Sequence, residues 1–343
     1  AYLRQLDVDP HAIIQSAADT INDDSAKPQH KHYPFPAGLT VHETLTHCID
    51  LGAPPSPTLA RLLTGKQKLD YKQEIAIPRR TILSLMIQHN NPLSLEDLLY
   101  HATKMKPRYY SISSSSSKDP SILRLTFRPI KYLTSQGHMR EGVCTNYMAS
   151  MVAAAAEADG DLEEQAQYMP VQINPNPSFR LPDDPQTSVL LIAGGCGVAP
   201  IRAFVEERIL KLKRGDTGSF GPGMVFLGFR RPEDAVYRSL LDKALDLGAL
   251  TEAMVSYSEG ATQEFQYAGN VNELVRTEAL KVWEHLEGGG YTYLCGGART
   301  FGASIEKELL EIIQEFGNFD IEGASKYVRQ LHTEGRLLED LAD

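Results

Sequence analysis

The chain has 343 residues, 42% of them hydrophobic, so it can bury a sizeable core and is long enough for two domains. Its 34 Lys and Arg against 44 Asp and Glu give a net charge of −10, which argues against nucleic-acid binding and suits docking on a basic partner. The four cysteines are widely spaced, which predicts neither a disulfide framework nor a metal site and favours a reducing compartment.

Hydropathy gives no sign of a membrane segment. No apolar run approaches the roughly 18 residues that a spanning helix needs, and no signal peptide is recognisable. We therefore expect a cytoplasmic location, or the cytosolic face of a membrane if an anchor was removed.

The N-terminal region is expected to be mainly helical. Apolar residues recur at helical spacing in four segments, 13–21, 39–51, 81–89 and 94–105. Prolines at 54, 55 and 57 interrupt the series as a loop would. We assign residues 1–106 to a helical connecting region.

After Pro107 the pattern changes to short strands. Strands are expected at 108–112, 122–127 and 171–173. A run of five serines and a Lys-Asp-Pro turn separate the first two, and residues 142–148 predict a loop that opens a helix. We assign residues 107–184 to part of an antiparallel barrel, which ends at a linker over 181–185.

Strands and helices alternate in the C-terminal region. Strands are expected at 188–193, 224–229, 251–257 and 291–295, and helices at 201–213, 232–247, 273–286 and 301–316. Four strand–helix steps predict a parallel sheet with helices on both faces. Residues 185–343 are therefore expected to form a doubly wound α/β domain.

A glycine-rich turn follows the first of these strands. Gly194-Gly195-Cys196-Gly197 lies between a buried strand and a helix, where backbone amides and the helix dipole can hold a pyrophosphate. A tight strand–helix connection without a ligand gives the same pattern, and the spacing is not G-x-G-x-x-G.

Two motifs in the barrel region suit a flavin nucleotide. In Arg108-Tyr109-Tyr110-Ser111 the arginine can pair with a phosphate and a tyrosine can stack on a flat ring. An ordinary strand with an exposed arginine is the alternative. Gly142-Val143-Cys144-Thr145 enters a helix and is either a second phosphate site or a plain helix cap.

The order of five motifs along the chain is more specific than any one of them. The two barrel motifs are followed by the glycine turn through Pro200, by Gly228-Phe229-Arg230-Arg231 and by Tyr293-Leu294-Cys295-Gly296-Gly297. Together they resemble the diflavin reductase family, which includes microsomal cytochrome reductases, sulfite reductase flavoproteins and the reductase part of nitric oxide synthases. The resemblance extends from residues 32–36 to Gly335-Arg336. It implies a ferredoxin-reductase-like fold, with a partial antiparallel FAD-binding barrel, a helical insert and an α/β nucleotide-binding domain.

The same resemblance implies cofactors, partners and residue roles. The cofactors would be FAD and NADPH or NADH, and the electron acceptor an FMN domain or a haem protein. FAD contacts are implied for Arg108, Tyr109, Tyr110, Ser111, Leu125, Thr126, Phe127, Gly142, Val143, Cys144 and Thr145. Nucleotide contacts are implied for Gly195, Cys196, Gly197, Pro200, Arg230, Ser256 and Tyr267. Ser111, Cys295 and Asp340 match the family's polar trio at the hydride-transfer site, although Cys295 equally suits a core position after a strand.

The sequence departs from the family pattern at several places. Tyr257 and Phe265 stand where the family has an Arg and a Lys for the nucleotide's 2′-phosphate, and Glu259 adds a negative charge nearby. Ala342 stands where an aromatic residue shields the flavin. Cys196 and Gly297 replace a usual Thr and a usual acid. The family's FMN domain and first barrel strands are not recognisable before residue 1, and residues 108–175 supply only about half of a barrel.

Three functions are therefore open. The first is an FAD module that moves hydride from NAD(P)H to the flavin and electrons onward. The second is an FAD-binding protein that no longer uses a nicotinamide nucleotide, acting as a scaffold or on another substrate. The third is a reductase that prefers NADH, since loss of the aromatic residue at position 342 eases access of the nicotinamide.

Overall fold

The computed structural model describes residues 9–14, 38–89, 93–134, 137, 139–157, 169, 171–259 and 267–342. Contacts divide the chain into two compact units. The helical unit comprises Ala1–Arg108 and Pro129–Ala166, and the α/β unit comprises Tyr109–Arg128 and Gln167–Asp343. We call Tyr109–Arg128 the strap, because this segment belongs to the α/β unit although the chain on both sides of it belongs to the helical unit.

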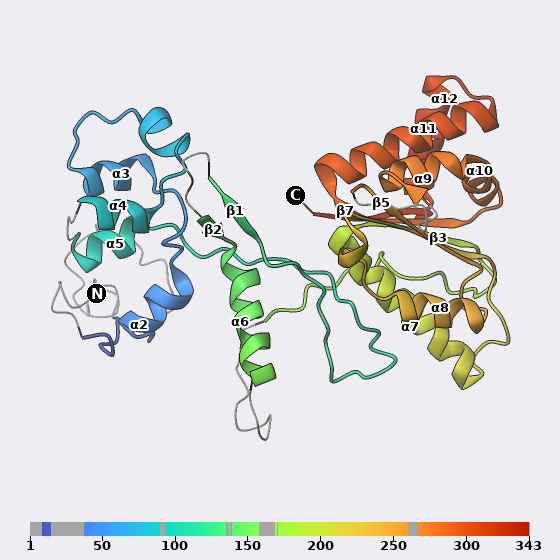
Figure 1. Ribbon diagram of the computed structural model, residues 1–343, viewed down its shortest axis with the longest axis horizontal. Coiled ribbons are helices and arrows are strands. Elements are labelled where there is room, and N and C mark those ends of the chain that lie inside the picture. Colours follow the sequence, from blue (N-terminus) through green and yellow to red (C-terminus); the bar gives the residue numbers. More distant parts are fainter. Residues whose placement is uncertain are drawn as a thin grey trace, which may run out of the picture. The chain divides into compact units, whose positions relative to one another are not determined.

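One six-stranded parallel sheet forms the centre of the α/β unit (Figure 1). Its strands are β3 Val189–Gly194, β4 Gly223–Phe229, β5 Glu252–Tyr257, β6 Tyr267–Ala268, β7 Tyr291–Gly297 and β8 Leu337–Ala342. The order across the sheet is β6-β5-β4-β3-β7-β8. The direction of winding reverses between β3 and β7, and ligands of such sheets bind at the carboxyl ends of the strands beside this point.

Helices cover both faces of this sheet (Figure 1). One face carries α7 Val198–Arg214 and α8 Arg238–Asp246, and the other carries α9 Val271–Thr277, α10 Ala279–Glu287, α11 Ala303–Gly317 and α12 Ile321–Thr333. The central strand β3 alternates between the two cores: Leu191 and Ala193 pack with α7, whereas Leu190 and Ile192 pack with α9 to α12. The predicted doubly wound fold is confirmed.

Several elements of this unit differ from the sequence prediction. The helix expected at 273–286 is divided at Glu278 into α9 and α10, and β6, α12 and β8 were not predicted. The sequence does contain a signal for α12, because aspartate is a preferred residue for capping the start of a helix. Asp320 has this role, and its side chain accepts a hydrogen bond from the Gly323 amide at 2.7 Å. Strand β8 is defined by its pairing with β7, which its own sequence does not reveal.

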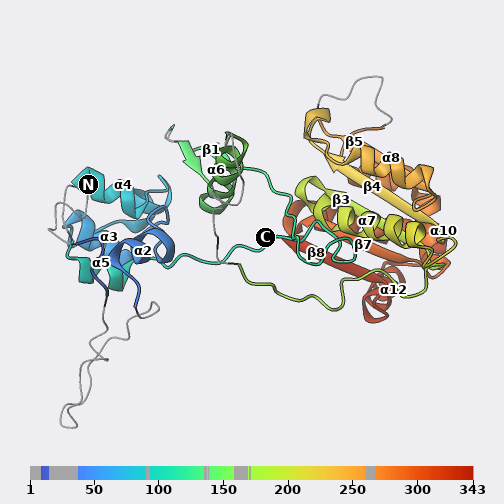
Figure 2. The same ribbon diagram turned by 90° about the horizontal axis from the view of Figure 1, so that it is seen from below.

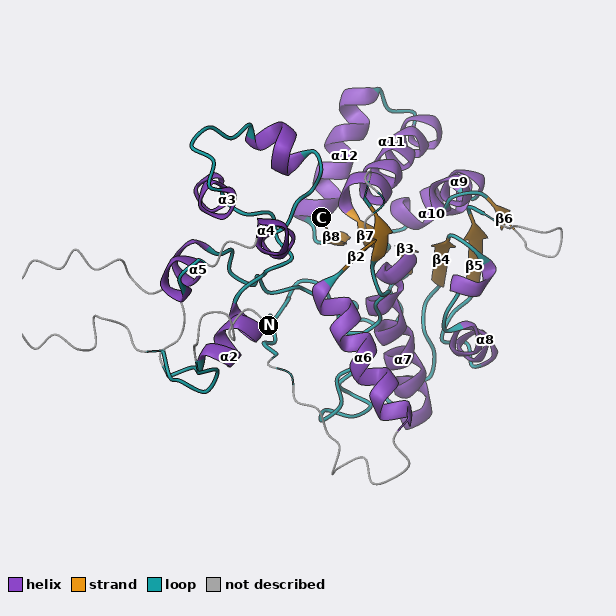
Figure 3. Cartoon of the chain, turned by 60° about the vertical axis from the view of Figure 1, so that its left-hand side comes forward, coloured by secondary structure: helices purple, strands orange, loops and turns teal. Residues whose placement is uncertain are grey.

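The strands predicted at 108–112, 122–127 and 171–173 are wrong. A strand requires a hydrogen-bonded ladder, and among the described residues these segments make one isolated bridge, between Ile112 and Leu125. None of the three segments belongs to either of the two sheets, whose strands are the orange arrows of Figure 3. The strap is instead held by side chains of α7 and of the segment before α8.

Among the residues that the structure describes, the helical unit contains the helices α2 to α6 and a small antiparallel sheet (Figure 2). The helices are α2 Val41–Glu43, α3 Pro57–Thr64, α4 Ile82–His89, α5 Leu95–His101 and α6 Val143–Glu157, and a π-helical turn Thr44–Cys48 follows α2. Strand β1 Lys131–Leu133 pairs with β2 Met139–Glu141. Buried Leu59, Leu63, Ile82, Leu85 and Leu98 form its core.

The helices predicted at 39–51, 81–89 and 94–105 are confirmed with shorter bounds. Of the segment 13–21 only Ile13 and Ile14 are described, and Ile13 forms a bridge with Thr40. Residues 32–36 lie outside the described residues. In the part of the chain that is described, no helix combines the length and the apolar composition needed to cross a bilayer.

Candidate functional site

The glycine turn connects β3 to α7 at the carboxyl edge of the sheet. Gly195 has a φ of +56°, a left-handed conformation that side chains disfavour. A Cβ on Gly197 would lie 2.0 Å from the Cys295 carbonyl oxygen, so only glycine allows the turn to approach β7 this closely. Cys196 is exposed on the turn, and Pro200 is buried in the first turn of α7, where its missing N–H costs nothing.

A cleft of about 540 Å³ opens beside this turn. Backbone of Gly194 and Gly228 lines it, together with Arg128, Arg230 and the hydroxyl-bearing residues Ser258, Thr300 and Ser304. Gly228 cannot bear a side chain without moving Val271, because an added Cβ would lie 2.8 Å from the Val271 Cβ. Backbone glycines, arginines and hydroxyls form a donor set that suits an anionic, hydroxyl-bearing ligand.

Two arginines and one glutamate form an ion-paired group at this cleft, the Arg–Glu cluster. Glu259 Oε1 accepts from Arg230 Nε at 2.8 Å, and its Oε2 accepts from Arg231 Nε at 3.4 Å. The hydrogen bond from Arg230 lowers the pKa of Glu259 and raises that of Arg230. The Glu259 amide also donates to the Arg230 carbonyl at 2.7 Å, so the backbone beyond β4 and β5 holds these side chains together.

Three residues predicted to lie at the nucleotide's phosphate do not line the cleft. Ser256 is buried and its hydroxyl donates to the Leu227 carbonyl at 3.4 Å. Tyr257 is 2% exposed and belongs to the core beneath α7 and α8. The Tyr267 hydroxyl donates to Glu278 at 3.1 Å. Phe265, the fourth residue of this prediction, lies outside the described residues.

Ser258 and Glu259 line the cleft instead. The reason is the position at which β5 ends, because residues inside a covered strand point into the two cores whereas the residues after its carboxyl end face the ligand edge. Strand β5 ends at Tyr257. The choice of residues that line the cleft therefore depends on where β5 ends, and residue type alone does not predict that boundary.

The predicted polar trio assembles at the other side of the glycine turn. The Ser111 hydroxyl donates to Asp340 Oδ2, and Asp340 lies opposite Cys295 in the pairing of β7 with β8. Burial raises the pKa of the Cys295 thiol, and the Asp340 carboxylate raises it further. Cys295 therefore remains a protonated thiol, and Ser111 and Asp340 are the more accessible members of the trio.

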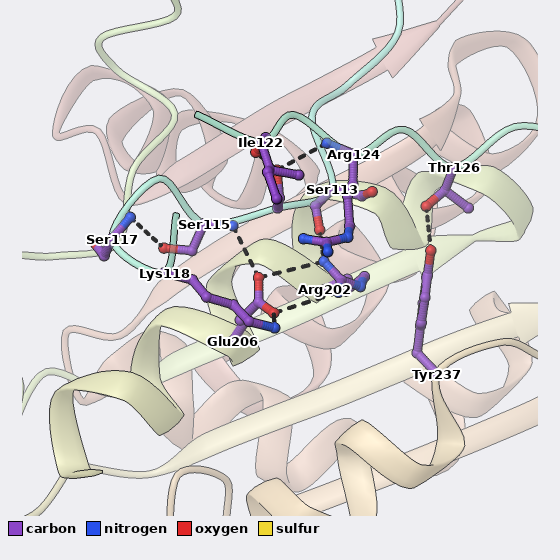
Figure 4. A network of polar contacts seen from close by, with 11 residues as sticks. Ser113, Ser115, Ser117, Lys118, Ile122, Arg124, Thr126, Arg202, Glu206 and Tyr237 are labelled. Atoms are coloured by element: carbon purple, nitrogen blue, oxygen red, sulfur yellow. Dashed lines mark hydrogen bonds and ion pairs between the residues drawn. The ribbon is translucent and has the colours of Figure 1, made fainter. Parts of the chain in front are cut away.

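Residues of α7 hold the middle of the strap (Figure 4). Glu206 accepts from the Ser115 amide at 3.1 Å and from Lys118 Nζ at 2.7 Å. Arg202 pairs with Glu206 at 3.4 Å and donates to the Ser113 carbonyl. Burial by itself raises the pKa of Glu206, but the hydrogen bonds from Lys118 and Ser115 hold it below its usual value. We expect Glu206 to be ionised in the folded chain.

A tyrosine on the segment before α8 holds the end of the strap. The Tyr237 hydroxyl lies 2.7 Å from the Thr126 hydroxyl (Figure 4). Tyr237 has a φ of +67°, and the Arg202 guanidinium lies 5.1 Å from the centre of its ring. We call Arg202, Glu206 and Tyr237 the strap clamp. No sequence pattern indicated it, because Arg and Glu on a helix normally face solvent.

The residues predicted to contact FAD are divided between the two units. On the strap, Tyr109 is 78% exposed, while the rings of Tyr110 and Phe127 meet edge to face at 6.3 Å. Leu125 and Thr126 are half-buried beside them. An exposed flat ring next to a hydroxyl residue suits an aromatic cofactor.

The other predicted FAD contacts lie in the helical unit. Arg108 Nη2 lies 3.4 Å from Asp50. The Thr145 hydroxyl accepts from the Ile130 amide at 3.2 Å, so it stabilises the start of α6. Val143 is exposed and Cys144 half-buried in the first turn of this helix, and a Cβ on Gly142 would crowd both Thr145 and Ile130. The start of a helix of 15 residues offers backbone amides to an anion.

Comparison with protein families gives two matches. Residues 65–147 match the FAD binding domain family, and residues 191–307 match the oxidoreductase NAD-binding domain family. The second range contains the glycine turn, the Arg–Glu cluster and Cys295. Both cofactor-binding regions implied by the motif order are therefore confirmed at the level of domains.

Curated relatives agree over most of the chain. Mouse methionine synthase reductase is 28% identical over 361 residues, covering 96% of this chain and 51% of that protein. Human NADPH–cytochrome P450 reductase is 29% identical over 335 residues, covering 91% and 47%. The sulfite reductase [NADPH] flavoprotein alpha-component of Salmonella typhi is 31% identical over 249 residues, covering 72% and 37%. The chain thus spans about half the length, or less, of these relatives.

Proposed function

Because this chain belongs to the diflavin reductase family, we propose that it binds FAD and a nicotinamide nucleotide, passes hydride from the nucleotide to the flavin, and passes electrons on to an FMN domain or a haem protein. The observation that carries the proposal is the assembled pair of Ser111 and Asp340 beside Cys295. These residues come from the strap, β8 and β7, which the fold brings together from distant parts of the sequence. Bound FAD would supply the chemistry of accepting the hydride.

The nucleotide would bind in the cleft at the carboxyl edge of the sheet. The amides of the glycine turn and the start of α7 would hold its pyrophosphate, since Gly195 and Gly197 leave room for a close approach. Arg128 and Arg230 would add positive charge and Ser258 a hydroxyl. Ser256 and Tyr267 would act through the packing of β5 and β6, because their side chains do not line the cleft.

FAD would be held by two sets of residues. On the strap, the ring of Tyr110 would pack against the flavin, with Ser111 and Leu125 to Phe127 beside it. In the helical unit, Arg108 and the amides at the start of α6 would hold the pyrophosphate. The support for these roles is the exposed ring of Tyr109, the half-buried aromatic and hydroxyl residues beside it on the strap, and the order of the motifs.

The polar trio would orient groups without exchanging covalent bonds. A Ser111 hydroxyl whose proton points to Asp340 presents its oxygen as an acceptor. The Cys295 thiol keeps its proton, because burial and Asp340 raise its pKa. Such fixed partners hold the reacting atoms in one geometry, which is the protein's main contribution to a hydride transfer.

The test is an anaerobic mixing experiment. FAD-loaded protein is mixed with NADPH or NADH, and bleaching of the flavin absorbance is followed. Bleaching by one of the two nucleotides within minutes is expected. If neither nucleotide bleaches the flavin, the proposed reductase activity is refuted, and an FAD-binding scaffold or a flavoprotein acting on another substrate takes its place. We also propose a cytosolic location, supported by four cysteines that are all free.

A further inference from the structure

We infer that Glu259 makes the nucleotide site select a ribose 2′-hydroxyl over a 2′-phosphate, so that NADH is the electron donor of this module. This inference rests on the proposed function. It concerns one carboxylate that lines the cleft, is joined to two arginines and is 46% exposed at its side chain.

The composition of the segment around Glu259 is the first support. Residues 256–268 contain two glutamates and no Lys, Arg or His. A phosphate monoester carries about two negative charges near neutral pH and is normally bound by Arg or Lys. Of the described residues that directly follow β5, Ser258 and Glu259 line the cleft, and Glu259 brings negative charge where a 2′-phosphate would need positive charge.

The geometry of the Arg–Glu cluster is the second support. Each oxygen of Glu259 pairs with a different arginine, at 2.8 Å to Arg230 and 3.4 Å to Arg231. The Glu259 carboxylate thus forms ion pairs with both arginines that follow β4. A 2′-phosphate that paired with the remaining N–H groups of these arginines would lie beside the Glu259 carboxylate, and the two negative charges would repel each other.

A ribose hydroxyl meets the opposite situation. A carboxylate oxygen can accept more than one hydrogen bond, so Glu259 can accept from a hydroxyl while it stays paired with Arg230 and Arg231. No ion pair is broken and no like charges are brought together. Acidic side chains recognise the ribose hydroxyl of NAD in other dinucleotide-binding sheets for the same chemical reason.

The last described residue of β8 is compatible with this donor. Ala342 pairs with Gly297 at the carboxyl end of β7, and both residues are exposed. Neither the methyl group of Ala342 nor Gly297 can stack on an aromatic ring. These two residues therefore make no aromatic contact that a nicotinamide would have to displace.

The test separates binding from activity by using nucleotide fragments. Calorimetric titration of the whole chain with 5′-AMP and with 2′,5′-ADP measures the affinity for the two ribose forms without any redox step. We expect 5′-AMP to bind at least about tenfold more tightly than 2′,5′-ADP. Glu259→Gln should remove most of that preference, because the 2′-phosphate beside Arg230 and Arg231 would no longer meet a negative charge.

A matched control is Glu284→Gln. Glu284 is a residue of α10, a helix that ends just before β7 begins and thus at the edge of the sheet opposite the cleft. This variant removes the same charge and should leave the ratio of affinities unchanged. Tighter binding of 2′,5′-ADP by the unmodified chain, an unchanged ratio in Glu259→Gln, or binding of neither fragment overturns the inference.

Flavin bleaching distinguishes failure of this inference from failure of the proposed function. If NADPH bleaches the flavin faster than NADH at low nucleotide concentration, the reductase stands and the role of Glu259 is refuted. If NADH bleaches the flavin about tenfold faster than NADPH, and Glu259→Gln reduces this difference in rate, the reductase activity and the role of Glu259 are both supported. If neither nucleotide bleaches the flavin, both are refuted.

Discussion

Replacing Glu206 with glutamine removes one charge from the strap clamp while nearly preserving the shape of the side chain. Glu206 is 6% exposed at its side chain and binds the strap through Ser115 and Lys118. The glutamine side chain would still accept from the Ser115 amide. It would lose the ion pairs with Lys118 and with Arg202, and Arg202 would keep the Ser113 carbonyl and the Tyr237 ring as partners.

The expected cost is about 2 kcal/mol in the free energy of unfolding of the α/β unit. Hydrogen bonds to a charged group contribute roughly 1.5–3 kcal/mol when the group is buried, as Glu206 is. The bond to Lys118 contributes less than this range, about 1 kcal/mol or less, because Lys118 is 47% exposed. The remaining partners of Arg202 limit the penalty of leaving its charge behind.

The single tryptophan makes this measurement specific to one unit. Trp283 lies on α10, so its fluorescence follows unfolding of the α/β unit in urea. The control is Glu207→Gln, the next residue of α7, whose pair with Lys211 at 3.3 Å is partly exposed and should contribute about 0.5 kcal/mol or less. Equal losses in the two variants would show that the strap clamp does not stabilise the unit.

Four further predictions concern the same unit. Asp340→Asn should slow flavin bleaching roughly a hundredfold with little change in nucleotide affinity, because Ser111 loses its charged partner; an unchanged rate in stopped-flow mixing would refute its orienting role. Gly197→Ala should cost roughly 1–3 kcal/mol by Trp283 unfolding, since its Cβ would meet the Cys295 carbonyl, whereas Gly218→Ala, with open space around it, should cost far less. Burial lowers the pKa of His285 from 6.5 to about 4, so the unfolded chain binds the extra proton and stability should fall as the pH drops from 6.5 toward 4; His285→Gln should flatten that slope. The pKa of Glu206 lies below 4.5, so its contribution is present above that pH and should be lost only as the pH falls further, a loss that Glu206→Gln should not show.

The α/β unit was predictable because its signals are local. A buried strand such as β3 is a continuous apolar run, and the glycine turn after it is a change of residue type within a few positions. Strand–helix alternation then fixes the topology. The short elements β6 and β8 escaped prediction because they acquire their identity from a neighbour, β5 and β7 respectively.

The strap was not predictable for a related reason. Alternating apolar residues in 122–127 gave the pattern of a strand, but the strand pairing of this described segment is limited to the isolated bridge between Ile112 and Leu125. Its stability comes from Arg202, Glu206 and Tyr237, which lie far away in the sequence and have the composition of a solvated surface. Burial of Glu206 results from tertiary packing, which no local sequence pattern predicts.

The candidate site was predictable in its chemistry and less so in its geometry. The motif order named Ser111, Cys295 and Asp340, and the fold assembles them, although their catalytic roles stay predictions. Glu259 was expected only to repel a phosphate. Its pairing with two arginines depends on where β4 and β5 end, and strand boundaries are the least certain part of a prediction from sequence.

The path of the strap has a consequence for dividing this protein into fragments. A fragment that begins at the linker near residue 185 would include every strand of the parallel sheet but not Ser113, Ser115 or Lys118. Glu206 and Arg202 would lose their strap partners, and Asp340 would lose Ser111. The α/β unit is therefore not formed by one contiguous stretch of the sequence. An insertion or a change of linker length at residues 108 or 129 would alter the nucleotide-binding unit, although neither position lies in its sheet.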